Sequence, residues 1–358
     1  MKTELVVPLA DVTCCQDVTE FHPPAAAAGA CQLQPGDVLD DRFVITEVIS
    51  RSGMALIYKA QDLHNANADV ALKVPHLESE SDGGFCPRLQ REEEIGLQLN
   101  HPYVVKFIAV TTPKSRPYLV TEYLRGCTLA HLMEAMSPLP EKDALKIARL
   151  LCEALQYLHD NGVVHRDLKP HNVMIGCDGT IRLLDFGVAS ARTLRRVTFA
   201  NSIPATGTPD YMAPEQVKGK RGDARTDIYG LGVMLYEMLT GKLPFEGDNL
   251  LAIMNAHVLG DPEPLRKLNP AISPQAEEIV LHAMERDPAR RHQSAQELGA
   301  ELDNPFGVPV TGRCERVELV APSKTKYRAY RTVLLVLVAP VIVPTAVALW
   351  LWLHPSVH

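Results

Sequence analysis

Residues 165–172 read HRDLKPHN, and residues 185–187 read DFG. A single DFG carries little weight, because aspartate before glycine is common in turns. Together, the two motifs supply carboxylate, amide and amine groups within a short stretch: Asp167, Lys169, Asn172 and Asp185. Carboxylate and amide oxygens suit hard cations such as Mg²⁺, which often share their oxygen ligands with substrate phosphates. The pair of motifs therefore indicates a site for a metal ion and a phosphate compound.

Further motifs surround this pair in a defined order. The apolar run VALK at residues 70–73 predicts a strand that ends in a lysine. The charged segment 89–99 predicts a helix. Downstream of DFG, the chain reads GTP at residues 207–209 and APE at residues 213–215. In this order, from about residue 43 to residue 302, the motifs resemble the eukaryotic-like Ser/Thr protein kinase family, in its bacterial membrane-anchored type.

The resemblance implies an α+β, two-lobed protein kinase fold, with a small β-rich lobe and a large helical lobe. We expect the kinase domain to occupy residues 41–302. The small-lobe strands are expected at 43–45, 56–60, 70–74, 104–110 and 118–121. In the large lobe, apolar residues at helical spacing predict a helix over 143–158, and a nearly continuous apolar run predicts a buried helix over 228–239.

The same resemblance implies transfer of the γ-phosphoryl group of ATP to Ser or Thr hydroxyls of protein substrates, including the chain itself. Asp167 is the implied acceptor of the hydroxyl proton, and Lys169 supports the transferring phosphate. Asn172 and Asp185 are the implied ligands of Mg²⁺, for which Mn²⁺ can substitute. The phosphate-binding lysine and its helix carboxylate would be Lys73 and Glu92.

The implied nucleotide-binding residues lie in the small lobe and in the hinge between the lobes. Ala71 belongs to the strand that ends in Lys73, and the backbone of Glu122 and Leu124 would bind adenine. The loop that covers the phosphates departs from the family's G-x-G-x-x-G pattern, in which glycines let the backbone approach phosphate closely. Its three positions here are Ser50, Ser52 and Ala55, with Gly53 as a neighbouring glycine. We therefore expect a stiffer or less closely fitting lid, and the effect on nucleotide affinity stays open.

Regulation by phosphorylation is a further expectation. Arg166 precedes the catalytic aspartate, where a cation can bind a phosphate of the activation loop and order that loop. The candidate phosphate acceptors are Thr193, Thr198, Ser202 and Thr206. The alternative is that these four are ordinary polar loop residues.

Composition excludes some other classes of protein. The net charge of −7 and the pI near 6.0 are not those of a nucleic-acid-binding protein with a basic surface, so no nucleic-acid partner is expected. The eight cysteines include no C-x-x-C pair, and the cysteine and histidine spacing suggests no zinc site.

The flanking segments indicate attachment to a membrane. Residues 1–40 resemble a flexible linker, and their acidic start and lack of a continuous apolar core predict no signal peptide. Residues 332–353 carry no charge and are long enough to span a bilayer, whereas the preceding linker, 303–331, is basic near its end. The positive-inside rule then predicts a single-pass protein of the bacterial inner membrane, with its kinase domain in the cytoplasm. Only five residues follow this span, so no extracellular sensor is expected.

Two alternative functions remain open at this point. The chain could be a pseudokinase scaffold, for which the substituted glycine-rich loop is the only support. It could instead be a phosphotransferase that acts on a small molecule, although such enzymes normally lack the segment from GTP to APE. The bacterial relatives also make a homodimer compatible with the sequence.

Overall fold

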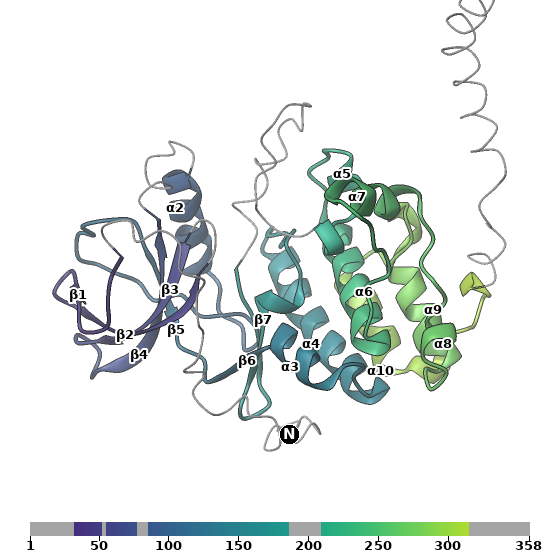
Figure 1. The fold of residues 1–358 in the computed structure, drawn as a ribbon, viewed down its shortest axis with the longest axis horizontal. Coiled ribbons are helices and arrows are strands. Elements are labelled where there is room, and N and C mark those ends of the chain that lie inside the picture. Colours follow the sequence, from purple (N-terminus) through teal and green to yellow (C-terminus); the bar gives the residue numbers. More distant parts are fainter. Residues whose placement is uncertain (1–31, 52–54, 77–84, 186–208, 315–358) are drawn as a thin grey trace, which may run out of the picture. The chain divides into compact units, whose positions relative to one another are not determined.

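The computed structural model describes residues 32–51, 55–76, 85–185 and 209–314, which form a smaller lobe built on a sheet and a larger helical lobe (Figure 1). The small lobe contains an antiparallel sheet in the strand order β1–β2–β3–β4–β5. Its strands are β1 (Val38–Leu39), β2 (Phe43–Arg51), β3 (Ala55–Asp62), β4 (Ala68–Pro75) and β5 (Leu119–Glu122). The helix α2 (Phe85–Gly96) accompanies this sheet (Figure 1). The sheet thus begins at Val38, within the segment that we expected to be linker.

The face of β4 that looks away from the small-lobe core carries the residues of functional interest. Val70, Leu72 and Val74 are buried in that core, as the two-residue period of a strand requires. Ala71 and Lys73 point to the opposite face and are half-buried. The alternation therefore places a small residue and a lysine side by side on one face of the sheet.

The strand expected over 104–110 does not form. This segment makes only isolated bridges, from Val104 to Leu183 in the large lobe and from Phe107 to Thr121 in β5. The apolar spacing did reflect burial, because Val104, Val105 and Phe107 are all buried. However, the segment has a different partner at each end, so it builds no ladder with either.

The large lobe begins with a small sheet and continues as helices. The sheet has the order β6–β7–β8 and consists of β6 (Gly126–Thr128), β7 (Val173–Gly176) and β8 (Ile181–Leu183). The longer helices are α3 (Leu129–Met136), α4 (Glu141–Asp160), α6 (Ala224–Thr240), α7 (Leu250–Leu259), α9 (Pro274–Ala283) and α10 (Ala295–Asp303). The short elements are η3 (Pro170–Asn172), η5 (Pro209–Tyr211), α5 (Pro214–Val217), α8 (Leu265–Leu268), η6 (Pro288–Arg290) and η7 (Pro305–Gly307).

The helix α6 forms the centre of the large lobe. It is buried along almost its whole length, as its nearly continuous apolar sequence predicted. The Asp223 side chain caps its first turn by accepting a hydrogen bond from the backbone of Arg225. Gly241 ends the helix with a φ of 72°, a left-handed conformation that glycine adopts without steric cost. Helix α4 packs against both α6 and α10.

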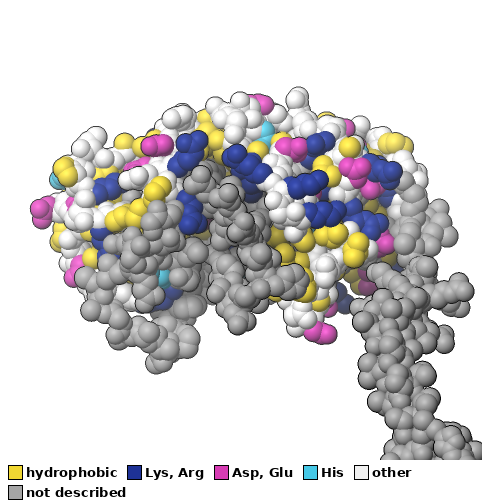
Figure 2. Space-filling model, turned by 90° about the horizontal axis from the view of Figure 1, so that it is seen from above, with side chains coloured by type: hydrophobic (Ala, Val, Ile, Leu, Met, Phe, Trp, Pro, Cys, Tyr) yellow, Lys and Arg dark blue, Asp and Glu magenta, His cyan; other side chains and the backbone are white. Residues whose placement is uncertain are grey.

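No helix within the described residues is long and apolar enough to cross a membrane. The predicted span, 332–353, lies outside those residues, as do most of the predicted linkers. The surface that is described carries both signs of charge. Figure 2 shows Lys and Arg side chains gathered over one face, with Asp and Glu side chains between many of them.

Candidate active site

The Asp167 carboxylate lies at the centre of the candidate site. Its Oδ2 accepts hydrogen bonds from Lys169 Nζ at 2.9 Å and from Asn172 Nδ2 at 3.1 Å. The turn η3 brings Asn172 back toward Asp167, so that the same amide also donates to the Asp167 carbonyl at 2.7 Å. The Asp167 side chain remains 44% exposed. The carboxylate is therefore held by two donors and is still accessible to a substrate.

A buried carboxylate braces the backbone of this loop. Asp227, near the start of α6, accepts hydrogen bonds from the backbone N–H groups of Arg166 at 2.7 Å and His165 at 2.9 Å. The ring of His159 lies 2.8 Å from the same carboxylate. Arg166 has a φ of 63°, which is unfavourable for a residue with a side chain and persists only where the surroundings hold it. Asp227 supplies that hold.

Two further contacts join the HRD and DFG motifs. The ring nitrogen Nε2 of His165 lies 2.9 Å from the carbonyl oxygen of Leu184, the residue before Asp185. The backbone N–H of Leu184 donates to the carbonyl of Asn172 at 2.8 Å. Asp185 itself has a φ of 43°. The backbone thus fixes Asp185 beside the turn that carries Asn172.

Lys73 connects the small lobe to Asp185. Its Nζ lies 2.8 Å from Asp185 Oδ1 and 3.1 Å from Glu92 Oε1 of α2. Gly96 lets the end of α2 approach the Phe107 ring, because a Cβ atom at this position would lie 2.5 Å from a ring carbon. The close packing of α2 helps to hold Glu92 over the strand that carries Lys73.

Charge coupling in this group of three changes the pKa of each member. Burial raises the pKa of Glu92 to about 7, although the Lys73 amine opposes the change. Burial alone would lower the pKa of Lys73, but the carboxylates of Asp185 and Glu92 outweigh it and raise this pKa. For Asp185, burial is again outweighed by Lys73, which lowers the pKa of the carboxyl. Asp185 is therefore the more firmly ionised of the two carboxylates.

The donor set near Asp185 fits a hard divalent cation. Asp185 is 42% exposed, and the Lys73 contact involves its Oδ1. The Asn172 amide nitrogen is committed to Asp167, which fixes the orientation of the amide group and of its oxygen. Carboxylate and amide oxygens are ligands that Mg²⁺ accepts alongside phosphate oxygens. Asn172 and Asp185 are thus the residues that could hold the ion.

The residues expected to bind nucleotide are spread over strands β2 to β5 and the segment that follows β5. Ala71 pairs with Thr121 across β4 and β5, on the same face as Lys73. The next residue, Glu122, donates its backbone N–H to the carbonyl of Lys106, and Leu124 packs against the large-lobe core. Ser50 and Ala55 are in β2 and β3. Ser52 and Gly53 lie outside the described residues.

The regulatory candidate Arg166 contacts Arg221 and Gln216 in addition to Asp227. Its Nε donates to the carbonyl of Arg221 at 3.0 Å, and its own carbonyl accepts from the Gln216 side chain at 3.0 Å. Burial, together with the nearby Arg221 charge, lowers the pKa of the Arg166 guanidinium. The predicted phosphate acceptors all lie outside the described residues: Thr193, Thr198, Ser202 and Thr206.

A buried ion pair holds the APE motif, residues 213–215, in place. Arg291 contacts both carboxylate oxygens of Glu215, at 2.9 and 2.8 Å, and its guanidinium lies over the Tyr229 ring at 4.8 Å. The Thr226 hydroxyl donates to the same carboxylate at 2.9 Å. Arg291 also donates to the carbonyl of Arg225. This ion pair joins the APE motif to the loop between η6 and α10.

Sequence reasoning missed two residues that support the site. His159, in the last turn of α4, contacts Asp227, and Gln216 holds the carbonyl of Arg166. His159 belongs to no motif, whereas Gln216 directly follows the APE motif but had no role assigned to it. A helical residue such as His159 gives no local signal of a contact with a carboxylate that is 68 residues away.

Comparison with known proteins agrees with this geometry. The family described as "Protein kinase domain" matches residues 43–301. The chain is 34% identical to the serine/threonine-protein kinase PrkC of Bacillus subtilis over 271 residues, which cover 76% of this chain and 41% of that protein. It is 36% identical to the serine/threonine-protein kinase PknB of Mycolicibacterium smegmatis over 268 residues, which cover 74% and 43%. The matches thus span less than half the length of these two relatives.

A solved structure is similar as well. The crystal structure of Rad53 1-466 in complex with AMP-PNP superimposes with a TM-score of 0.61 and 26% sequence identity. The match covers 75% of this chain and 66% of that one. The ATP analogue in that complex belongs to Rad53, and the common feature of the two chains is the fold.

Proposed function

Because the chain belongs to the protein kinase family, we propose that it transfers the γ-phosphoryl group of ATP to Ser and Thr hydroxyls of proteins. The observation that carries this proposal is that two sets of polar side chains, one around Asp167 and one around Lys73, lie in the same site. The Asp167 carboxylate is held by Lys169 and Asn172, and Lys73 joins Glu92 to Asp185. The set around Lys73 could bind the phosphates of the donor, and the set around Asp167 could bind the hydroxyl group of the acceptor.

Asp167 is proposed to act on the acceptor. Its exposed carboxylate accepts a hydrogen bond from the substrate hydroxyl and receives the proton as the oxygen attacks phosphorus. The Lys169 amine, 2.9 Å from Asp167, contributes positive charge beside the transferring phosphate. The Asn172 amide keeps the Asp167 carboxylate in one orientation.

Lys73 is proposed to act on the donor. Its amine binds the α- and β-phosphates, and Glu92 keeps the amine in position from α2. Asn172 and Asp185 are the residues that would hold Mg²⁺, whose charge offsets that of the phosphates when it is bound. Most of the rate enhancement in such a site comes from positioning and fixed charge, so each of these side chains should matter by orders of magnitude.

An assay of the full chain with ATP and Mg²⁺ tests the proposal. Mass spectrometry after incubation with a generic protein substrate should find phosphate on Ser or Thr residues of the substrate, and of the chain itself. Asp167→Asn provides the matched control. ATP binding without any phosphate transfer would favour the pseudokinase scaffold, and turnover with small alcohols alone would favour a small-molecule phosphotransferase.

We further propose that residues 332–353 anchor the kinase domain to the bacterial inner membrane, with that domain in the cytoplasm. The support is the uncharged apolar sequence of this segment and the basic residues just before it. Lys324, Lys326, Arg328 and Arg331 would remain on the cytoplasmic side. Alkaline carbonate should fail to extract the full chain from membranes but should release a variant that ends at residue 331. Extraction of both chains would contradict the anchor.

A further inference from the structure

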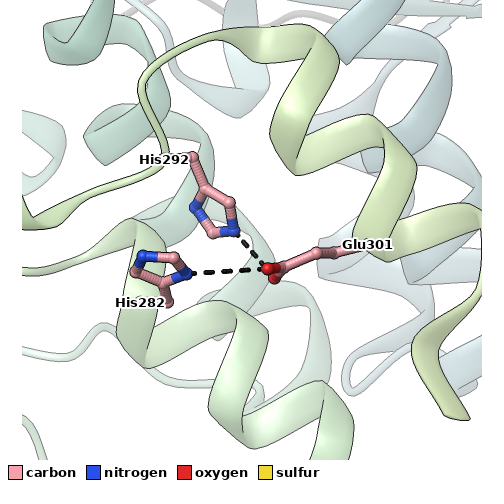
Figure 3. A group of neighbouring side chains, drawn as sticks. All are labelled: His282, His292 and Glu301. Atoms are coloured by element: carbon pink, nitrogen blue, oxygen red, sulfur yellow. Dashed lines mark hydrogen bonds and ion pairs between the residues drawn. The ribbon is translucent and has the colours of Figure 1, made fainter. Parts of the chain in front are cut away.

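Outside the motifs of the candidate site, three potential metal ligands meet in the large lobe, between α9 and α10. Among the described residues, His282, His292 and Glu301 form a group whose ligand atoms all lie within 4.8 Å of one another (Figure 3). His282 belongs to α9, Glu301 to α10, and His292 to the loop before α10. Figure 3 shows both imidazole rings directed at the same carboxylate.

The distances in this group approach those of a coordination site. His292 Nε2 lies 2.8 Å from Glu301 Oε2, and His282 Nδ1 lies 3.8 Å from Glu301 Oε1. A tetrahedral ion with bonds of about 2.0–2.1 Å places its ligand atoms roughly 3.4 Å apart. The two observed separations fall on either side of this value, and the ligand atoms of the whole group lie within 4.8 Å of one another, so side-chain rotations would bring all three to one ion.

The surroundings hold one of the donors in place. The His292 ring is fully buried, and among the described residues its Nδ1 has no hydrogen-bond partner. Glu301 is therefore the contact that orients the ring.

A second observation is the close approach of the two imidazoles. Their ring centroids are 3.9 Å apart, at an angle of 39°. Both rings reach the same carboxylate, so one cation could be shared by the three side chains. His282 and Glu301 are half-buried, with side chains 18% and 27% exposed, so an ion and a water molecule could enter from that side.

We propose that His282, His292 and Glu301 bind a divalent transition-metal ion, with Zn²⁺ as the best fit. Two imidazoles and one carboxylate suit Zn²⁺ and not Mg²⁺, which prefers oxygen ligands alone. A water molecule would complete the tetrahedron. The ion would join α9, α10 and the loop between them. The inference does not depend on the proposed kinase activity.

An ion at this site would also affect the neighbouring loop that carries Arg291. His292 directly follows Arg291, whose guanidinium holds Glu215 of the APE motif. An ion bound to His292 would restrict the loop that carries Arg291, and so would strengthen the anchor of that segment. Cysteine and histidine spacing gave no indication of this site, because its ligands come from three separate elements.

Titration with Co²⁺ tests the proposal, because this ion replaces Zn²⁺ and reports its ligands by visible absorption. The full chain is used in an Asp185→Asn background, so that the catalytic carboxylate does not contribute. We expect one equivalent of Co²⁺ to give d–d bands of a four-coordinate ion, without the thiolate charge-transfer band that cysteine ligands would produce. Glu301→Gln and His282→Asn should each weaken binding by about ten-fold or more.

His131→Asn is the matched control, because His131 also lies beside a glutamate, Glu134, in an exposed pair. This variant should bind Co²⁺ like its parent. Unfolding in the presence of EDTA establishes that each variant is folded without metal. The proposal is overturned if the parent chain shows no such bands, or if the Glu301 and His282 variants bind Co²⁺ as tightly as the His131 variant does.

Discussion

The amine of Lys73 lies 2.8 Å from the carboxylate of Asp185, and this contact joins the small lobe to the large one. Glu92 contacts the same amine from α2 at 3.1 Å. One cation therefore stands between two carboxylates that would otherwise repel each other. The contact couples the geometry of the small lobe to that of the segment that carries Asp185.

Replacing Lys73 should remove activity without unfolding the protein. Lys73→Met keeps much of the apolar stem but leaves Glu92 and Asp185 without their shared cation. We expect kcat/KM for ATP to fall by about 10²-fold or more, because a phosphate contact and the lobe connection are both lost. Lys267→Met, which alters an exposed large-lobe lysine paired with Glu263, is the control and should change kcat/KM little. Near-normal activity of the Lys73 variant would refute its assigned role.

The pKa of Glu92 should appear in the pH dependence of catalysis. Burial raises this pKa to about 7, so lowering the pH through 7 protonates Glu92 in the free enzyme and weakens its hold on Lys73. We expect kcat/KM for ATP to be roughly ten-fold lower at pH 6 than on the plateau above pH 8. Glu92→Gln should be less active throughout and should lack this inflection. An identical inflection in both proteins would assign it to ATP or to another residue.

The same carboxyl affects stability with the opposite sign. Its pKa in the folded protein is higher than in the unfolded chain, so between about pH 4.5 and 7 the folded state binds more protons. Stability should therefore fall as the pH rises through this window, and Glu92→Gln should reduce that fall. Chemical denaturation at several pH values gives both slopes. Equal slopes for the two proteins would contradict the raised pKa.

The ion pair between Glu215 and Arg291 should contribute strongly to folding. Arg291→Ala leaves a buried carboxylate with the Thr226 hydroxyl but without its cation, which should lower the free energy of unfolding by about 3–5 kcal/mol. Lys267→Ala, in an exposed pair with Glu263, should cost only about 0–1 kcal/mol. Urea denaturation of the two variants measures the difference. Similar losses in both would show that burial does not strengthen the Arg291 contact.

Asp227 should affect catalysis through the backbone that it holds. Asp227→Asn keeps the size of the side chain but replaces one acceptor oxygen with an NH₂ group, which faces donors at Arg166 and His165. We expect about 1–3 kcal/mol of lost stability, and a kcat reduced at least ten-fold because the Asp167 loop relaxes. The Asp261→Asn variant, altered at a carboxylate paired with Arg286, should keep its kcat. An unchanged kcat for Asp227→Asn would mean that the loop holds its shape without the brace.

The sequence was sufficient for the parts of the fold that short segments encode. The two-lobed fold followed from the order of the motifs, and helix α6 followed from its uninterrupted apolar run. The Lys73–Glu92 contact followed from motif spacing, although the catalytic roles of these residues stay predictions. By contrast, residues 104–110 have the pattern of a strand but pair with two different elements, and no local pattern encodes that choice of partner.

Contacts made by residues outside the recognised motifs were the other part that the sequence could not supply. The meeting of His159 with Asp227 depends on how α4 packs against α6, which is a property of the folded core. The His282, His292 and Glu301 group likewise depends on how α9, α10 and a loop come together. Single histidines on helices are common, and only their spatial arrangement separates a ligand from an ordinary buried side chain.

The most direct test of the proposed function is phosphoryl transfer by Asp167→Asn. This substitution keeps the size of the side chain and leaves an oxygen that can accept from Lys169, but it removes the carboxylate that would receive the hydroxyl proton. We expect autophosphorylation and substrate phosphorylation to fall by about 10²–10⁴-fold, while ATP affinity and the unfolding transition stay close to those of the parent. Activity within a few-fold of the parent would contradict the proposed mechanism.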